Sequence, residues 1–304
     1  QIAGFCNNTF GEAIGLEIAG FYNYNHKRIQ GIQAAGFANG AMGDVEGAQL
    51  SGFANHSQGS SMIQVAGFSN TSMGKKAGFQ AAGFANFSRG SGLGTQLAGF
   101  ANTTTGHIKG IQVAGFVNVA KKISGIQIAP FNVADTLEDG IAIGVWSIVR
   151  NGYKTIQIGG NETLYGEISL KSGVKRFYNI VSVGASVRNN SVKWGWGYGI
   201  GSLWGISQRL DLGLEAMVYH INEDQWWTNN SNLLNRVNLS ANYQLTKTLG
   251  VYAGPSWNVW VSHNRRNLAS IDPTFGGSYW YDKTTTRNRV AMYPGFTAGV
   301  RVSL

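Results

Sequence analysis

The sequence predicts an all-β protein in two parts, an N-terminal β-solenoid built from 16-residue repeats followed by a C-terminal antiparallel β-barrel. Three observations lead to this prediction. A phrase of about sixteen residues recurs from residue 1 to about residue 139, long alternating segments fill residues 153–304, and the connections between those segments alternate between tight and long. Recurrence at a fixed period is typical of architectures in which similar units stack on one another.

Each copy of the repeat centres on a phenylalanine and follows the pattern Gly-x-Gln-aliphatic-Ala-Gly-Phe-x-Asn. Successive phenylalanines are sixteen residues apart, except for two steps of fifteen. The central phenylalanines are Phe5, Phe21, Phe37, Phe53, Phe68, Phe84, Phe100, Phe116 and Phe131.

A glutamine precedes each phenylalanine by four residues, with Glu17 in one copy, and an asparagine follows each of the first eight phenylalanines by two residues. In an extended strand these residues share one parity and point to one face, while the aliphatic and glycine positions point to the other. We expect equivalent residues of successive repeats to form structural ladders. Those expected in the ladders are Phe37, Phe53, Phe68, Phe84, Phe100, Phe116, Asn39, Asn55, Asn70, Asn86, Asn102 and Asn118.

Two architectures place equivalent residues side by side at this period. In a parallel β-solenoid each repeat is one coil, and like side chains stack about 4.8 Å apart. In a wide barrel of about 16–18 strands that includes the repeats, each repeat would be one membrane-spanning strand of about 9–11 residues with its turn. We favour the solenoid because the face opposite the amides is small and does not suit lipid, as in one copy with Ala48, Leu50, Gly52 and Ala54.

The chain divides into residues 1–139, the repeat array, residues 140–152, a cap or hinge, and residues 153–304, the barrel. The repeat pattern fades between Gly125 and Arg150, and Pro130 stands where other copies carry glycine. The last unit of a stack is expected to be atypical, because it must cover an open edge. The chain begins in repeat register, so we expect the numbering to start inside a mature or trimmed protein.

Eight long alternating segments follow the junction. They are predicted at about 153–159, 163–171, 177–188, 193–206, 209–222, 233–246, 249–263 and 288–304. In 209–222, leucine, alanine and valine alternate with Asp211, Glu215 and other polar residues. Length beyond the usual globular strand, together with a charged opposite face, indicates strands that face lipid outside and water inside. A soluble β-sandwich is the alternative, and it predicts shorter strands and fewer tryptophans.

The connections agree with a barrel of the outer-membrane type. Turns at 207–208 and 246–248 are tight, whereas 222–232 and 263–288 are long and polar with aromatic residues. Short turns on one side and long loops on the other are the plan of such barrels. The residues expected in interfacial aromatic girdles are Trp194, Trp196, Trp204, Trp257, Trp260 and Tyr243.

Charge and cysteine content limit the function. The chain has a net charge of +9, with nine Lys and Arg against seven Asp and Glu in residues 1–150, and fifteen against eight in residues 151–304. No basic run exceeds two residues, so we expect contact with lipid headgroups or lipopolysaccharide and not with nucleic acid. The one cysteine, Cys6, excludes an intramolecular disulfide and a multi-cysteine metal site.

No residues pair a nucleophile with a base, and the five histidines are scattered without metal-ligand spacing. We therefore expect no enzyme activity, no cofactor and no metal. Aromatic and basic residues gather in the two long loops, a composition that suits contact with carbohydrate, lipid or protein. The expected loop contact surface consists of Trp226, Trp227, Arg265, Arg266, Tyr279, Trp280 and Tyr281. Packing of these rings on one another, or in the headgroup layer, explains them equally well.

Several phrases resemble a group of surface-repeat outer-membrane β proteins of the Bacteroidota type. The phrases are Gly-Ile-Gln-Val-Ala-Gly-Phe-Val-Asn (110–118), Gly-Asn-Glu-Thr-Leu-Tyr (160–165), Arg-Phe-Tyr-Asn-Ile (176–180), Gly-Tyr-Gly-Ile-Gly (197–201) and Ala-Gly-Pro-Ser-Trp-Asn-Val (253–259). The resemblance covers nearly the whole chain and implies a β protein of the outer membrane of a Gram-negative bacterium. It implies no activity or site.

These observations predict a non-enzymatic outer-membrane protein whose barrel anchors a repeat scaffold or contact surface, with a protein partner in an envelope complex. Two alternatives stay open at this stage. One is a porin-like pore formed by a single wide barrel, and the other is a surface adhesin that binds glycan or protein.

Overall fold

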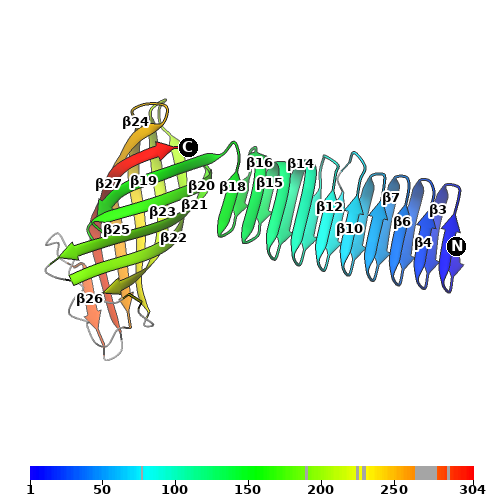
Figure 1. The fold of residues 1–304 in the computed structure, drawn as a ribbon, viewed down its shortest axis with the longest axis horizontal. Helices are drawn as coiled ribbons and strands as arrows, with labels where there is room; N and C mark the ends of the chain where they lie inside the picture. The colour runs from blue at the N-terminus through cyan, green and yellow to red at the C-terminus, as the bar shows by residue number, and fades with distance from the viewer. Residues whose placement is uncertain (77, 189–190, 224–225, 228–230, 264–278, 286–287) are drawn as a thin grey trace. The chain divides into compact units, whose positions relative to one another are not determined.

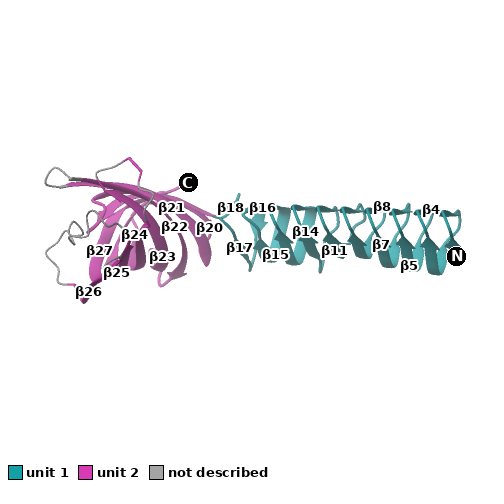
Figure 2. Cartoon of the chain, turned by 90° about the horizontal axis from the view of Figure 1, so that it is seen from below, with its two compact units in different colours: residues 1–152 teal, residues 153–304 magenta. Residues whose placement is uncertain are grey.

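The computed structural model describes residues 1–304 apart from 77, 189–190, 224–225, 228–230, 264–278 and 286–287. The chain forms two compact units, Gln1–Gly152 and Tyr153–Leu304 (Figure 2). Every regular element in the described residues is a β-strand. Each unit is described by itself.

The first unit is a parallel β-solenoid of about nine turns (Figure 1). One sheet contains β1 (Ile2–Ala3), β3 (Ala13–Ala19), β5 (Ile29–Ala35), β7 (Val45–Ser51), β9 (Ser61–Ala66), β11 (Phe79–Ala82), β13 (Thr95–Ala98), the later parts of β14 (Ala101–Ala114) and β15 (Val117–Ile128), and β17 (Ile141–Ile143). The other contains β2 (Cys6–Thr9), β4 (Tyr22–Asn25), β6 (Ala38–Ala41), β8 (Ala54–Ser57), β10 (Ser69–Ser72), β12 (Ala85–Ser88), the earlier parts of β14 and β15, β16 (Phe131–Leu137) and β18 (Trp146–Val149). We call them the first and the second sheet.

Amide side chains form the interior of the solenoid. Parallel pairing places Gln33 beside Gln49 and Asn39 beside Asn55 in adjacent coils. The Nε2 of Gln49 donates to the Oε1 of Gln33 at 3.0 Å, and the Nδ2 of Asn39 donates to the Oδ1 of Asn55 at 2.9 Å. These side chains are at most 1% exposed, so the ladders satisfy buried polar groups that would otherwise destabilise the fold.

Phenylalanine rings stack along the bend between the two sheets. From Phe5 to Phe116 successive ring centroids are 4.8–5.1 Å apart and the interplanar angles do not exceed 11°. The assignment of Phe131 to this series is wrong, because Phe131 pairs with Val117 and its ring meets Phe116 at 60°. Pro130 occupies the ladder position, since the last repeat has one residue fewer before Asn132.

The glycine that precedes each phenylalanine is required by the close approach of adjacent coils. A Cβ atom at Gly36 would lie 2.1 Å from the carbonyl oxygen of Gly20. Any larger residue would push the coils apart and break the backbone hydrogen bonds between them. The Ala-Gly-Phe phrase is therefore a consequence of stacking.

The repeats are solenoid coils, so the wide barrel of about 16–18 strands is wrong, and with it the wide pore that depended on it. The reason is that equivalent strands pair in parallel, whereas a membrane barrel needs antiparallel neighbours. Residues 140–152, expected as a cap or hinge, contain β17 and β18, which pair with β15 and β16 and continue both sheets.

The second unit is a closed antiparallel barrel of eight strands. The strands are β19 (Tyr153–Asn161), β20 (Gly166–Val174), β21 (Phe177–Arg188), β22 (Ser191–Gly205), β23 (Leu210–Glu223), β24 (Asn232–Gln244), β25 (Leu249–Ser262) and β27 (Arg289–Ser303). Pairing of β19 with β27 closes the barrel, and the short β26 (Tyr281–Thr284) adds to β27 beyond the end of β19.

Side chains in the barrel alternate with the polar set inside. In β23, Asp211, Glu215 and Tyr219 are buried, while Leu214 and Val218 are 43% and 47% exposed on the outside. The predicted girdle residues Trp196, Trp204, Trp257 and Tyr243 also lie outside, each 43–46% exposed. Trp260 was wrongly placed among them. It is 1% exposed, and its indole Nε1 donates to Asn232 Oδ1 at 2.6 Å, because its parity in β25 is opposite to that of Trp257.

No helix in the described part of the chain is long and apolar enough to cross a membrane.

Interrupting an amide ladder should destabilise the solenoid. Replacement Asn70→Ala removes the side-chain acceptor of Asn55 Nδ2, which keeps its bond to the carbonyl of Val65, and removes the donor to the Oδ1 of Asn86. Because both are buried, we expect the free energy of unfolding to fall by about 2–4 kcal/mol in chemical denaturation. The control Thr71→Ala, on the outward face of the same strand, should cost less than about 1 kcal/mol. Equal losses in both variants would contradict the structural role of the ladder.

Candidate functional site

Three regions of the described chain have the features of a functional site. They are the lumen of the barrel with its aromatic loops, a cleft in the solenoid, and an apolar face on the solenoid.

The barrel lumen contains a buried network of charges. Arg236, 2% exposed, donates from its guanidinium to Asn161 Oδ1 at 2.7 Å and to Glu162 Oε1 at 3.2 Å. A second guanidinium nitrogen lies 3.7 Å from Glu167 Oε2. One guanidinium thus faces two carboxylates inside the barrel, and its removal would leave both carboxylates without this cation.

Further ion pairs lie at other levels of the same lumen. Lys171 pairs with Glu215, whose carboxylate also accepts from Tyr178 at 2.7 Å. Toward the tight turns Arg301 and Lys175 approach Asp211 at 3.5 and 3.2 Å. Each charge therefore faces an opposite charge.

The connection between β19 and β20 folds into the barrel. Glu162 Oε2 accepts from the backbone N–H of Phe296 at 2.9 Å, Thr163 Oγ1 is 3.0 Å from the hydroxyl of Tyr293, and Leu164 is fully buried. The predicted strand 163–171 therefore starts at Gly166, because residues 162–164 enter the lumen. The sequence does not predict that this segment enters the lumen. The one available signal is that residues 160–165 interrupt the alternation of apolar and polar residues in the strands before and after them.

The described side chains fill the middle of the lumen. The gap lined by Glu167, Glu215 and Tyr252, among others, has a volume of about 10 Å³. This is near the lower limit for a single water molecule. The described lumen is thus a packed core and supports anchoring.

The aromatic residues of the expected loop contact surface form two groups. Trp226 is 86% exposed with its ring 5.4 Å from Trp194, and Trp227 lies 5.3 Å from His220. Tyr279 meets Tyr293 edge-on at 6.1 Å, with the Arg289 guanidinium 5.6 Å from its ring.

Residues 280 and 281 complete the second group. Trp280 is 65% exposed and Tyr281, in β26, is 45% exposed. The first group contacts β22 and β23, and the second contacts β27. In the barrel, β24 and β25 lie between β23 and β27. Arg265 and Arg266 lie outside the described residues.

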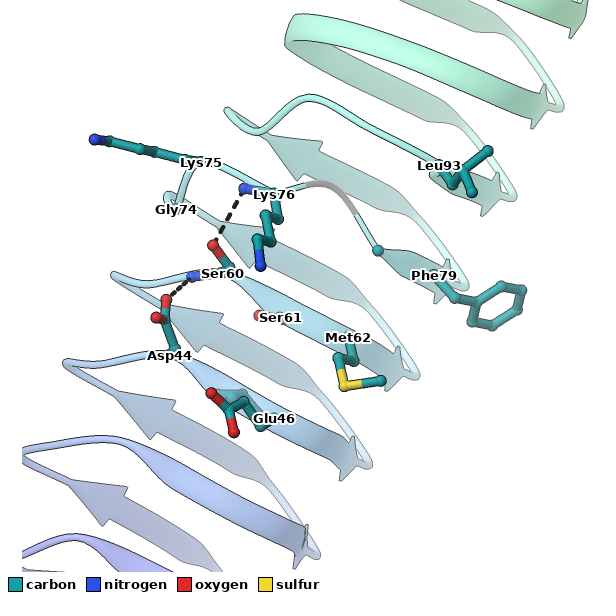
Figure 3. Close-up of a pocket in the computed structure, with 12 residues that line it drawn as sticks. Asp44, Glu46, Ser60, Ser61, Met62, Gly74, Lys75, Lys76, Phe79 and Leu93 are labelled. Carbon is teal, nitrogen blue, oxygen red and sulfur yellow. Dashed lines mark hydrogen bonds between the residues drawn. The ribbon is translucent and has the colours of Figure 1, made fainter.

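The solenoid cleft forms where a repeat is one residue short. Val45 pairs with Ser61, but the next pair is Ala48 with Ile63. The chain therefore advances three residues along β7 for two along β9, which is a β-bulge. This bulge opens a cleft of about 870 Å³ (Figure 3).

One flank of the cleft is polar and the other is apolar. Asp44 accepts from the backbone N–H of Ser60 at 2.6 Å, and the Ser60 hydroxyl accepts from the N–H of Lys76 at 3.1 Å (Figure 3). Met62 and Phe79 lie on the opposite flank. The charged groups at the rim are exposed, so water screens them, and an ionic ligand would gain little there.

Two solenoid histidines are shifted toward the neutral form. Burial lowers the pKa of His56, which lies within β8 and not in a turn as its place in the repeat suggests. Burial and the neighbouring ammonium groups of Lys122 and Lys109 lower the pKa of His107, whose Nε2 is 2.9 Å from Ser124 Oγ. Among the described residues, no group of three or more His, Cys, Asp and Glu side chains is placed to hold a metal ion.

The outward side of the first sheet and the adjoining phenylalanine ladder form one continuous apolar surface, which we call the apolar face. Its side chains are each 37–48% exposed. They are Phe21, Phe37, Phe53, Phe68, Phe84, Phe100, Phe116, Leu16, Ile32, Ile63, Phe79, Ile111, Leu50, Val65, Leu97, Ile128 and Ile143. Register places the members from the first sheet in two columns along the solenoid, which are interrupted by Ala48 and Thr95 in one column and by Ala34 and Ala81 in the other.

Comparison of the chain with protein-family models and with curated proteins finds no match.

The lumen network should be needed for barrel stability. In Arg236→Met, Glu162 and Glu167 lose their cation in a buried site, so we expect about 3–5 kcal/mol less stability. The measurement is the urea midpoint in detergent, followed by heat-modifiable gel migration. The double variant Arg236→Met, Glu162→Gln should recover part of the loss.

The matched control is Arg209→Met, which removes an exposed arginine beside a tight turn. An Arg236→Met barrel as stable as this control would refute the role assigned to the network.

Proposed function

We propose that the protein is a non-enzymatic outer-membrane protein of a Gram-negative envelope, in which the barrel is the anchor and the solenoid is a contact surface for a partner. The observation that carries the proposal is the inverted polarity of the barrel. A closed eight-stranded barrel encloses ion pairs and exposes isoleucine, leucine, valine and tryptophan on its outer surface. Water does not favour such a surface, whereas lipid does.

The spacing of the outer aromatic residues fits a bilayer. Trp196 and Trp204 are eight residues apart in β22 and both point outward. Eight residues span about 27 Å along a strand, and strand tilt of about 40° reduces this to roughly 20 Å along the barrel axis. This height agrees with an apolar band of about 25 Å bordered by aromatic girdles.

The connections support the same topology. Ile206–Arg209 and Leu245–Thr248 are turns of four residues closed by backbone hydrogen bonds, such as Ile206 N to Leu210 O at 2.8 Å. β25 ends at Ser262 and β27 begins at Arg289, at the end of the barrel opposite these turns. The chain enters the barrel at Tyr153 and ends beside the tight turns, the end that faces the periplasm in barrels of this plan. The solenoid is then periplasmic.

A charge on the outer surface should impair insertion. Leu214→Arg places a guanidinium on the lipid-facing side of β23 and should cost about 2–4 kcal/mol if it lies near the bilayer midplane. The readout is the fraction that refolds into lipid vesicles, measured by heat-modifiable migration. Gln208→Arg adds the same charge at a tight turn and should refold like the unmodified chain. Efficient refolding of the Leu214→Arg chain, or a purified protein that stays folded and monodisperse without amphiphile, would overturn the proposal.

Adhesion through the loops is a second candidate function, favoured by the exposure of Trp226. An indole that is 86% exposed beside a second tryptophan ring offers a stacking surface for a sugar or an apolar side chain. If this site binds glycan, Trp226→Ala should reduce binding on a glycan array by at least about tenfold, and Trp204→Ala, on the outer barrel surface near the tight turns, should not. Unchanged binding in Trp226→Ala would exclude this residue from the contact.

A further inference from the structure

The apolar face of the solenoid is too large to remain uncovered in water. Its seven phenylalanines from Phe21 to Phe116 are each 41–45% exposed, and its aliphatic columns are exposed to a similar degree. With about 150–250 Å² per aromatic side chain, the uncovered apolar area is roughly 1,000 Å². The largest apolar patch on a typical monomer is about 300–600 Å², whereas a stable interface buries about 800 Å² on each partner.

The apolar face contains a ridge and a groove that run side by side. The stacked phenylalanine rings form the ridge. The groove is hollowed at two places, about 530 Å³ around Ala34 and about 460 Å³ around Ala81, where alanine replaces the larger aliphatic residue of the column. Each ridge residue follows the groove in sequence, as in Ala34-Ala35-Gly36-Phe37.

This arrangement is complementary to itself. If a second copy faces the first across a two-fold axis parallel to the solenoid and midway between ridge and groove, the ridge of each copy enters the groove of the other. The contact is isologous, so both grooves are filled by the same operation. Both copies also have the same axial repeat of about 4.8 Å, so every coil meets an equivalent coil.

We propose that the apolar face is the interface of a parallel homodimer. The parallel direction rests on the proposed membrane anchoring. Parallel solenoids bring their C-terminal ends, each followed by a barrel, to the same end of the dimer, and both barrels can then insert into one membrane. Antiparallel solenoids would place the barrels at opposite ends.

The first experiment measures the mass of the full-length chain in detergent by light scattering with correction for bound detergent. The chain mass is 32.7 kDa, so a dimer has twice this protein mass. In Leu50→Lys, Leu97→Lys two ammonium groups would be buried in the interface, and the dissociation constant should rise by at least about a hundredfold. Both leucines are 39–40% exposed, so the monomer tolerates lysine at these positions.

The control is Ile148→Lys, because Ile148 is 41% exposed but lies on the second sheet. It should remain dimeric. Circular dichroism and heat-modifiable migration verify that every variant is folded.

A second experiment tests the direction without destabilising the fold. Single cysteines are placed at Leu50, Leu97 or Ile148 after Cys6→Ser removes the exposed native thiol. Leu50 and Leu97 are three coils apart, or about 14 Å along the solenoid. In a parallel dimer each position lies at the same height as its equivalent in the other copy, across the two-fold axis, so both should cross-link with a short bismaleimide and Ile148→Cys should not.

The possible outcomes are distinct. A wild-type chain that is monomeric at all concentrations, or a monomer that holds lipid on this face, overturns the dimer. Cross-linking at only one of the two leucine positions overturns the parallel arrangement. Detergent requirement and heat-modifiable migration report on the barrel alone, so loss of the dimer with these intact leaves the proposed function standing.

Discussion

Hydrogen bonding between the backbones of successive coils is the constraint on which the solenoid depends. It fixes an axial repeat of about 4.8 Å and places each residue over its equivalent, as Gln49 over Gln33. A residue choice made once is thereby repeated along the whole stack. Amides become ladders, phenylalanines become a column of parallel rings, and positions that face a neighbouring carbonyl can only be glycine, as at Gly36.

The two amide ladders run in opposite directions. Each glutamine donates to the preceding coil, as from Gln80 to Gln64 at 2.8 Å, whereas each asparagine donates to the following coil, as from Asn70 to Asn86 at 2.9 Å. Aligned amide dipoles in one ladder are therefore opposed by those in the other. The glutamine ladder ends at Glu17. Its carboxylate accepts from Gln33 at 2.8 Å and has no N–H group that would need an acceptor.

Much of the fold could be predicted because the determining signals are local and periodic. Parity along a strand separates Gln33 from Ile32, and it separates Glu215 from Leu214 in the barrel. The expectation that phenylalanine and the amides point to one face is wrong, because the chain bends between β5 and β6 and leaves Phe37 41% exposed although it has the parity of the buried Gln33 and Asn39. The eight barrel strands follow from the same alternation. The residue type of Trp260 is typical of an interfacial girdle, but its parity, opposite to that of Trp257, places it inside the barrel.

The remaining features could not be predicted, because they depend on contacts between residues far apart in sequence. Glu162 enters the lumen to meet Arg236, Asn258 and the backbone of Phe296, and nothing near residue 162 announces these partners. Phe131 lies outside the ring column because the last repeat is shorter and Pro130 occupies the position of the phenylalanine. Only the pairing of Asn132 with Asn118 reveals this difference. The ladders of the solenoid were accessible from sequence, whereas the ion-pair network of the lumen was not.

Both units enclose polar side chains and expose apolar ones, although each also contains a buried apolar cluster, as at Leu164 and Trp260 in the barrel and at Ile29 and Val45 in the solenoid. The exposed apolar surfaces connect the proposed anchor with the proposed contact surface. In a barrel inserted in a membrane, as proposed, the outward valines and leucines would contact lipid, which would stabilise this arrangement. In the solenoid only one side is inverted in this way, and a lipid shell cannot cover it if the solenoid lies in the periplasm. Burial of apolar surface contributes about 25 cal/mol of free energy per Å², so any partner that covers the apolar face is favoured. Under the proposed function, a second copy of the chain would be anchored at high local concentration in the same membrane and would present a surface with the same period, so it would cover this face at a lower entropic cost than a freely diffusing protein.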